Sequence, residues 1–198
     1  MSAAEQIRDA AALVLVRPSA TGAQVLMGQR GARAVFMPSK YVFPGGASGA
    51  EDLPGDLSPL APLCAARLAR GSDSPGALVT AALRELEEET GQSFHPGAVR
   101  LRYIFRAITP PGDTRRFDAR FFLADAAALQ TDPLDFSQAE DELSHLHWIG
   151  LTEARALDLP FITEIVLSEV GNLLRGGSQP GVPFFDNSGS RPQFHRIL

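Results

Sequence analysis

The sequence contains one cysteine and one lysine among its 198 residues, and each scarcity excludes something. Because Cys64 stands alone, no disulfide can form within the chain. Lys40 is the single lysine, so nearly all positive charge is carried by arginine, which suits planar two-point contacts with phosphate. The net charge of -5 excludes a broad basic surface. We therefore expect no nucleic-acid partner.

The sequence also lacks a long apolar run. The longest, Ala10 to Val16, is far shorter than the roughly 20 residues that span a bilayer, so we expect no membrane association. Residues 1–9 are polar and show no apolar segment of a signal peptide. Together with the lone cysteine, these features predict a cytoplasmic location.

The composition is that of an ordinary globular protein, with 44% hydrophobic and 21% charged residues. The length favours a single domain covering residues 1–198. Residues 53–75 are rich in Pro, Gly and Ser, and we interpret them as an insertion or a lid. Residues 176–198 have a similar composition, which predicts an irregular C-terminal tail.

Strand and helix patterns are mixed along the chain without strict alternation. Strands are predicted at 10–17, 23–30, 41–43, 99–109, 116–124 and 145–149. Helices are predicted at 60–70, 75–90, 153–159 (capped by Thr152) and 161–175. This order predicts an α+β fold in which helices pack on a mixed sheet.

The helix expected at residues 75–90 has clear boundaries. Ser74 and Pro75 suit its N-cap and first position, and Gly91 suits the left-handed residue that follows a helix. Its apolar residues, Val79, Leu83 and Leu86, share one side, so that side should pack on a core.

Three carboxylates lie on nearly the opposite side of this helix. Glu85, Glu88 and Glu89 are spaced three and four residues apart, so they share a face and repel one another. A divalent cation such as Mg²⁺ would reverse this repulsion, and Arg84 could orient Glu88. A solvated acidic helix end is the alternative. We prefer that alternative for Glu87, and the helix alone leaves the question open for the other three.

A Pro-Gly-Gly segment lies upstream, at Pro44 to Gly46. Its glycines would allow the backbone to approach a metal or ligand closely, so that the Gly45 carbonyl could act as a ligand. Such pairs are also common markers of a simple tight turn, and we expect a turn here in either case.

Together the two segments resemble the Nudix box, G-x5-E-x7-R-E-U-x-E-E-x-G-U, in which U is a bulky apolar residue. Arg84, Glu85, Leu86, Glu88, Glu89 and Gly91 match its second half, and Gly46 matches its first glycine. The segment between them is about 24 residues longer than the pattern, the first Glu position falls on Asp52 when counted from Gly46, and Gln92 replaces the last apolar residue. The segments F-M-P-S-K-Y-V-F-P-G-G and R-R-F-D-A-R-F-F-L-A resemble the branch that contains peroxisomal coenzyme A diphosphatases.

The resemblance implies a Nudix α/β/α sandwich with an insertion inside the box, and Mg²⁺- or Mn²⁺-dependent hydrolysis of a nucleoside diphosphate derivative. It implies metal ligation by the Gly45 carbonyl, Glu85, Glu88 and Glu89, with Arg84, Glu85 and Glu88 in catalysis. A late loop often supplies a further base in this family, and among Glu140, Asp141 and Glu142 we favour Glu142. Candidate substrate-binding residues are Arg30, Arg33, Phe36 and Arg116, and Arg115 could also meet a substrate phosphate.

Three functions remain open at this point. The first is a diphosphatase acting on coenzyme A or acyl-CoA, and the second is a pyrophosphatase for ADP-ribose or another dinucleotide. The third is a regulatory Nudix domain that binds nucleotide without hydrolysing it. A small-molecule diphosphate is the expected partner in each case, and a homodimer is left open.

Overall fold

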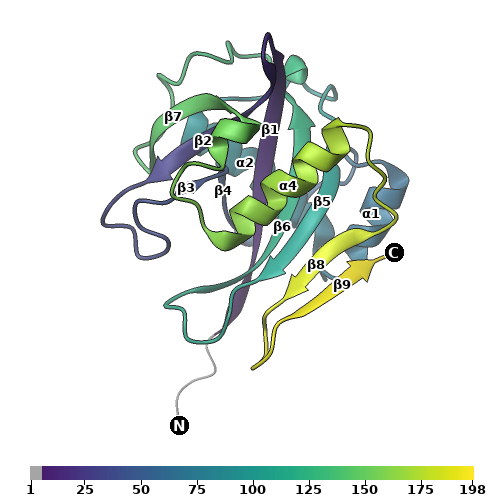
Figure 1. The fold of residues 1–198 in the computed structure, drawn as a ribbon. Coiled ribbons are helices and arrows are strands. Elements are labelled where there is room, and N and C mark those ends of the chain that lie inside the picture. The colour runs from purple at the N-terminus through teal and green to yellow at the C-terminus, as the bar shows by residue number, and fades with distance from the viewer. Residues whose placement is uncertain (1–5) are drawn as a thin grey trace.

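The computed structural model describes residues 6–198, which form a mixed sheet flanked by helices (Figure 1). The strands follow the order β3-β2-β1-β6-β5-β8-β9, while β4 pairs with β1 and β7 pairs with β2. The strands are β1 (Ile7–Ser19), β2 (Gly22–Arg30), β3 (Tyr41–Val42), β4 (Gly45–Ala47), β5 (Arg102–Ile108), β6 (Arg116–Asp125), β7 (Leu143–Gly150), β8 (Val182–Asp186) and β9 (Gln193–Ile197). The helices are α1 (Pro62–Ala69), α2 (Pro75–Thr90), α3 (Leu151–Ala154) and α4 (Phe161–Leu174), with the short 3-10 turns η1 (Ala50–Asp52) and η2 (Ala126–Ala128).

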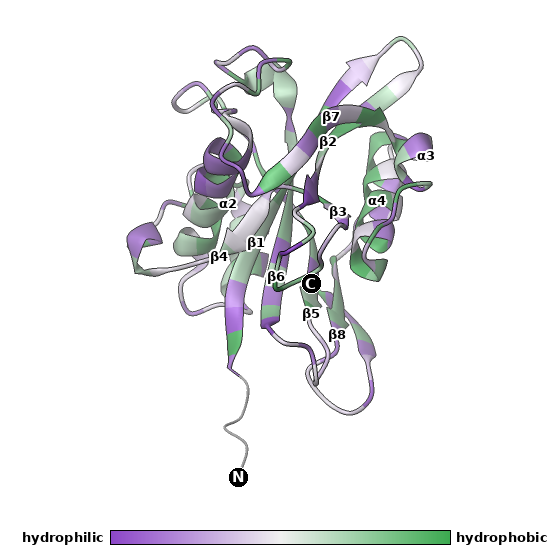
Figure 2. Ribbon diagram, turned by 90° about the vertical axis from the view of Figure 1, so that its left-hand side faces the viewer, coloured by the Kyte–Doolittle hydropathy of each residue, from purple (hydrophilic) through white to green (hydrophobic). Residues whose placement is uncertain are grey.

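Helices cover both faces of the sheet. Figure 2 shows α2 on one side of the strands and α4 on the other. Leu13 and Leu15 of β1 pack towards α2, whereas the alternating Val14 and Val16 pack towards α4, as expected for a strand buried on both faces. The predicted α+β sandwich with a mixed sheet is therefore confirmed.

The central strand β1 organises the region around the acidic helix. Along residues 7–16 it runs parallel to β6. Its first half also pairs with β4, with Ala11 opposite Gly46, and its last residues pair with β2. This change of partner places β4 directly beside α2.

Three local predictions are wrong. The Gly45-Gly46 segment is not a turn, because pairing with β1 holds it extended in β4. The C-terminal tail is not irregular: β8 pairs with β5, and β9 pairs with β8. The helix expected at 153–159 is only α3, which follows Gly150 rather than a Thr152 cap. The chain then leaves the helix, and the Asp158 carbonyl accepts a hydrogen bond from the Tyr41 N–H.

The segment expected to be an insertion or lid, residues 53–75, packs on the α2 side of the sheet. Leu60 and Leu68 are buried in the same hydrophobic cluster as Leu78 and Leu86 of α2. Arg67 donates a hydrogen bond of 2.7 Å to the Pro180 carbonyl. Its role as a lid stays a prediction.

A buried arginine ties this segment to the sheet. Arg120 of β6 is 1% exposed and donates to Asp9 Oδ1 and the Asp118 carbonyl, both at 2.6 Å, and to the Gly71 carbonyl. Asp118 also accepts two hydrogen bonds from Arg106. Three separate parts of the chain therefore meet at one guanidinium.

We expect Arg120→Met to lower the free energy of unfolding by about 3–5 kcal/mol, because it leaves buried acceptors without a donor. Urea unfolding of the variant beside Arg102→Met, an exposed arginine on neighbouring β5, provides the measurement and its control. Equal unfolding midpoints would show that the network contributes nothing.

None of the helices within residues 6–198 is long and apolar enough to cross a bilayer. The expected absence of a signal segment concerns residues 1–9, of which residues 1–5 lie outside the described part.

Candidate active site

A cleft of about 460 Å³ opens on the α4 side of the sheet and reaches β4 at one end. Glu85, Gly45, Gly46, Arg30 and Glu142 line this end. These residues are spread over more than a hundred sequence positions, and they meet because β2 and β4 both pair with β1 while β7 pairs with β2. The structure thus brings the Gly-Gly segment, the acidic helix and the late loop to one place.

Helix α2 positions the three glutamates as the sequence predicts. It begins at Pro75 and ends before Gly91, which has the left-handed φ of 71°. Val79 and Leu86 are buried in the core, so the opposite face is directed to β4. Ser74 occupies the N-cap position, but its side chain makes no capping hydrogen bond.

Glu89 is buried against β4 and is 2% exposed. The Gly45 N–H donates a hydrogen bond of 2.7 Å to its Oε2, while its Oε1 is buried and has no hydrogen-bond partner. Burial, together with the charges of Glu85 and Glu142, raises the pKa of Glu89 to about 8, although the Gly45 hydrogen bond opposes the shift. An unpaired buried oxygen of this kind is a ready ligand for a cation.

Glycine is required opposite Glu85. A Cβ atom at Gly46 would lie 2.3 Å from Glu85 Oε1, and one at Gly45 would lie 2.5 Å from the Ala11 carbonyl oxygen. Neither glycine has a positive φ, so close approach rather than unusual backbone conformation explains them.

Arg84 connects the acidic residues. Its Nη1 lies 2.9 Å from both Glu85 Oε1 and Glu88 Oε2, as predicted for Glu88. Its Nε and Nη2 lie 3.0 and 3.2 Å from the two oxygens of Asp52. The hydrogen bond with Asp52, followed by the one with Glu85, raises the pKa of the Arg84 guanidinium further above its ordinary value. Arg84 thus orients the glutamates rather than facing the cleft.

Asp52 is a site residue that sequence reasoning noted but did not assign. It is 1% exposed and also accepts the Gly49 N–H at 2.9 Å. Burial alone would raise its pKa, but the hydrogen bonds from Arg84 and Gly49 outweigh burial and hold the pKa below its ordinary value. The one signal in the sequence was that Asp52 falls on the first Glu position of the Nudix box when counted from Gly46. The pair with Arg84 gave no signal, because the inserted segment separates the two residues in the sequence.

We expect Asp52→Asn to lower the free energy of unfolding by about 1–3 kcal/mol, because it removes the buried charge that Arg84 pairs with. Glu51→Gln is the matched control: Glu51 lies 3.9 Å from Arg84 and its side chain is 62% exposed, so this change should be nearly neutral. Urea unfolding midpoints decide the comparison. Equal midpoints for the two variants would contradict the role given to Asp52.

The chemistry of the donor set suits a hard divalent cation. Burial is the largest cause that raises the pKa of Glu85, and the charges of Glu88 and Glu142 add to it. Within residues 6–198, no group of three or more acidic, His or Cys side chains is already arranged to hold an ion. In the structure, Arg84 binds Glu85 and Glu88, and the Gly45 N–H binds Glu89. The free Oε1 of Glu89 and the mutual repulsion of the carboxylates fit a cation at this position.

The candidate substrate-binding residues separate into two groups. Arg30 and Phe36 line the cleft, and Phe36 packs edge-on against Phe117 at 5.0 Å between ring centroids. Arg33 is exposed and lies outside the cleft lining. Arg116 is also outside it, because its guanidinium donates to the carbonyls of Thr109 and Ser188. The arginines that do line the cleft besides Arg30 are Arg8 and Arg115.

Gln92, which replaces the apolar residue at the end of the box pattern, is fully buried. Its side chain donates to the carbonyls of Asp132 and Asp135 and accepts from the Thr131 hydroxyl. The hydrogen bonds of Gln92 therefore hold the loop at residues 131–135, which leads towards Glu142, against the C-terminal end of α2.

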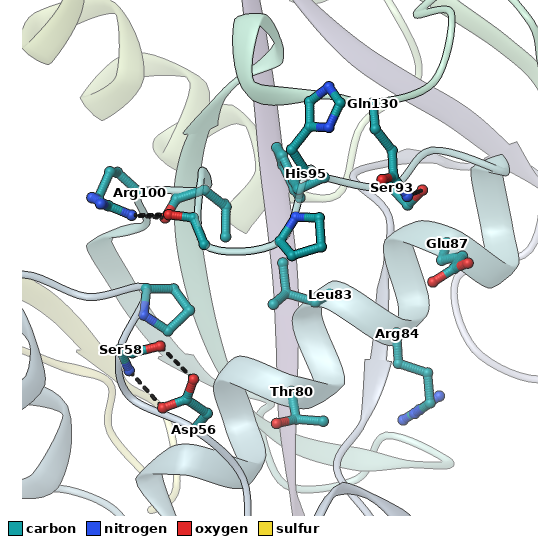
Figure 3. Close-up of a pocket in the computed structure, with 15 residues that line it drawn as sticks. Asp56, Ser58, Thr80, Leu83, Arg84, Glu87, Ser93, His95, Arg100 and Gln130 are labelled. Carbon is teal, nitrogen blue, oxygen red and sulfur yellow. Dashed lines mark hydrogen bonds between the residues drawn. The ribbon is translucent and has the colours of Figure 1, made fainter.

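A second pocket, of about 610 Å³, lies on another side of α2 (Figure 3). Glu87, Leu83 and Thr80 of α2 line it together with the loop around His95. Glu85, Glu88 and Glu89 are not among its lining residues. This arrangement separates Glu87 from the other three glutamates, as the sequence predicted.

Comparison with known proteins identifies the fold. No family model and no curated protein matches the sequence. A Nudix hydrolase structure from Alicyclobacillus acidocaldarius is 27% identical, with a TM-score of 0.61 over 84% of this chain and 91% of that one. The Nudix domain of Shewanella oneidensis NrtR, complexed with ADP ribose, is 15% identical, with a TM-score of 0.56 over 86% and 90%. An Ap4A hydrolase complex from C. elegans is 18% identical, with a TM-score of 0.54 over 86% and 99%.

The fold is that of the Nudix hydrolases. The neighbour that is 27% identical is a hydrolase of this fold, and Gly46 and Glu85 of the Nudix-box pattern line the cleft, whereas Glu88 and Glu89 are outside its lining.

Proposed function

We propose that this protein is a divalent-cation-dependent hydrolase that cleaves the diphosphate linkage of a nucleoside diphosphate derivative. The observation that carries the proposal is the meeting of Glu85, Gly46 and Glu142 at one end of a single cleft, with the buried Glu89 beside them. The cleft lining contains three arginines and three acidic side chains, so it offers a diphosphate no net positive charge by itself. A bound cation would supply that charge.

Glu85, Glu88 and Glu89, with the Gly45 carbonyl, are the groups we assign to Mg²⁺ or Mn²⁺. The cation would offset the charge of the diphosphate and lower the pKa of water. The residues of the chain bind and orient: Arg30 meets phosphate oxygens, Arg84 fixes the glutamates, and Glu142 accepts a proton from the attacking water. Water adds to one phosphorus, the bridging P–O bond breaks, and two phosphate monoesters result.

The test is hydrolysis of a panel of diphosphates with Mg²⁺ or Mn²⁺, followed by product identification. We expect turnover of at least one compound of the panel and none with chelator. Binding without turnover under all conditions would instead indicate a regulatory nucleotide-binding domain.

For the substrate we propose a diphosphate with an apolar end, as in an acyl-CoA. The cleft lining also contains a group of apolar side chains, those of Pro160, Phe161, Ile162, Phe185, Ile108 and Phe121. Phe161 is 62% exposed at the start of α4, with its ring 5.9 Å from that of Phe185. An aliphatic group would cover these apolar side chains and gain from their removal from water.

We expect kcat/KM for hexanoyl-CoA to exceed kcat/KM for free coenzyme A. Phe161→Ser should reduce the ratio of these two values about 3- to 10-fold, because one aromatic contact is lost. Leu134→Ser, at another exposed apolar residue outside the cleft, should leave the ratio unchanged. Preferential turnover of ADP-ribose over both compounds would favour the dinucleotide alternative.

A further inference from the structure

Two of the cleft residues with proposed roles are paired with each other. Arg30 Nη2 lies 2.8 Å from Glu142 Oε1, and both side chains line the cleft beside Glu85. Arg30 is the last residue of β2, and Glu142 directly precedes β7, next to the residue that pairs with Arg30 in the sheet. The candidate phosphate-binding arginine and the candidate base therefore neutralise one another in the structure.

The two partners are held differently. The backbone of Arg30 is fixed on one side by residues 39–40, because its N–H donates to the Lys40 carbonyl and its carbonyl accepts the Ser39 N–H, and on the other side by pairing with Leu143 of β7. Its side chain is 18% exposed. Glu142, by contrast, ends a loop, and its side chain is 54% exposed. Movement at this pair would therefore come from Glu142.

Arg30 also has unused hydrogen-bonding capacity. A guanidinium carries five N–H donors, and the Arg30 Nε is buried without a partner. A phosphate group offers several acceptor oxygens in the geometry that a guanidinium prefers, whereas Glu142 engages only one nitrogen. A diphosphate could therefore satisfy Arg30 better than Glu142 does.

We propose that a bound diphosphate takes over Arg30 and releases Glu142, so that Glu142 competes with substrate for this arginine in the free enzyme. The inference rests on the proposed function. Once released, Glu142 remains beside the reacting end of the cleft, where its charge already raises the pKa of both Glu85 and Glu89. The contact thus links substrate arrival to the availability of the base.

The test is a double-mutant cycle on binding of α,β-methylene-ADP, a diphosphate analogue that this reaction cannot cleave, measured by calorimetry with and without Mg²⁺. Glu142→Gln should bind the analogue about 3- to 10-fold more tightly than the wild type, although it lowers turnover of cleavable diphosphates. Arg30→Gln should bind it about tenfold more weakly. In the Arg30→Gln background the gain from Glu142→Gln should disappear.

The double-mutant cycle distinguishes replacement of Glu142 by diphosphate at Arg30 from simple repulsion between Glu142 and the anion. If Glu142 merely repelled the anion, its removal would tighten binding equally in both backgrounds, and that result would overturn the inference. Asp141→Asn, an exposed neighbour outside the cleft, should leave binding unchanged. Arg30→Lys keeps the charge without the planar fork, and should fall between wild type and Arg30→Gln.

The inference and the proposed function fail in different ways. Hydrolysis of the diphosphate panel, with Glu142→Gln binding no tighter than wild type, would overturn the exchange and leave the proposed function standing. Absence of both hydrolysis and binding would overturn both.

Discussion

Replacing Glu88 by Gln should lower kcat for diphosphate hydrolysis by about 10²- to 10³-fold, a loss typical when one charge-stabilising group is removed from an active site. The amide has the same shape, so its oxygen can still accept the hydrogen bond that Arg84 makes at 2.9 Å. What it loses is the negative charge that would hold a divalent cation. The fold should therefore be retained while activity falls.

Glu87→Gln is the matched control for this change. Glu87 is one residue away on the same helix, but it lines the second pocket rather than the cleft (Figure 3). Its substitution should leave kcat within about twofold of wild type, as for a surface carboxylate. Equal activities of the two variants would remove Glu88 from the mechanism.

The second large effect concerns the glycines of β4. Gly46→Ala should abolish most of the activity with little loss of stability, because its methyl group would meet the flexible end of the Glu85 side chain and displace the carboxylate. Gly45→Ala should instead destabilise the fold by about 1–3 kcal/mol. At that position the new methyl group meets the backbone of Ala11 and Ala12, which pairing between β1 and β4 holds in place.

Gly46→Ala should therefore show the larger loss of hydrolysis rate, and Gly45→Ala the larger decrease in urea midpoint. Gly31→Ala provides the control, since a Cβ at Gly31 meets nothing within 4 Å and its φ is not positive. If Gly46→Ala retained full activity, Glu85 would not need its observed position against β4.

Sequence patterns predicted the elements that are fixed locally. The limits of α2 follow from Pro75 and Gly91, and its buried face follows from residue spacing. Strand β4 could not be predicted in this way, because Pro44, Gly45 and Gly46 favour a turn and only pairing with β1 makes them extended. The C-terminal hairpin is similar: its short strands are surrounded by turn residues, and β5 provides the edge on which β8 forms.

The same distinction applies to the candidate site. The grouping of Glu85, Glu88 and Glu89 on one helix face is a local property, and the sequence was sufficient to predict it. Pairs such as Arg84–Asp52 and Arg30–Glu142 join residues distant in sequence, so only the fold reveals them. Sequence position also could not distinguish Arg115 from Arg116. Arg115 lines the cleft, whereas the guanidinium of Arg116 binds the carbonyl of Thr109, the residue after β5.

We expect the acidic face of α2 to hold divalent cations beside β4. Anomalous diffraction from crystals soaked with Mn²⁺ and α,β-methylene-ADP tests it most directly. We expect anomalous peaks between the carboxylates of Glu85, Glu88 and Glu89 and the diphosphate of the analogue, adjacent to Gly45. Diphosphate density in the cleft with no anomalous peak at these carboxylates, or with the Mn²⁺ bound elsewhere, would contradict the account.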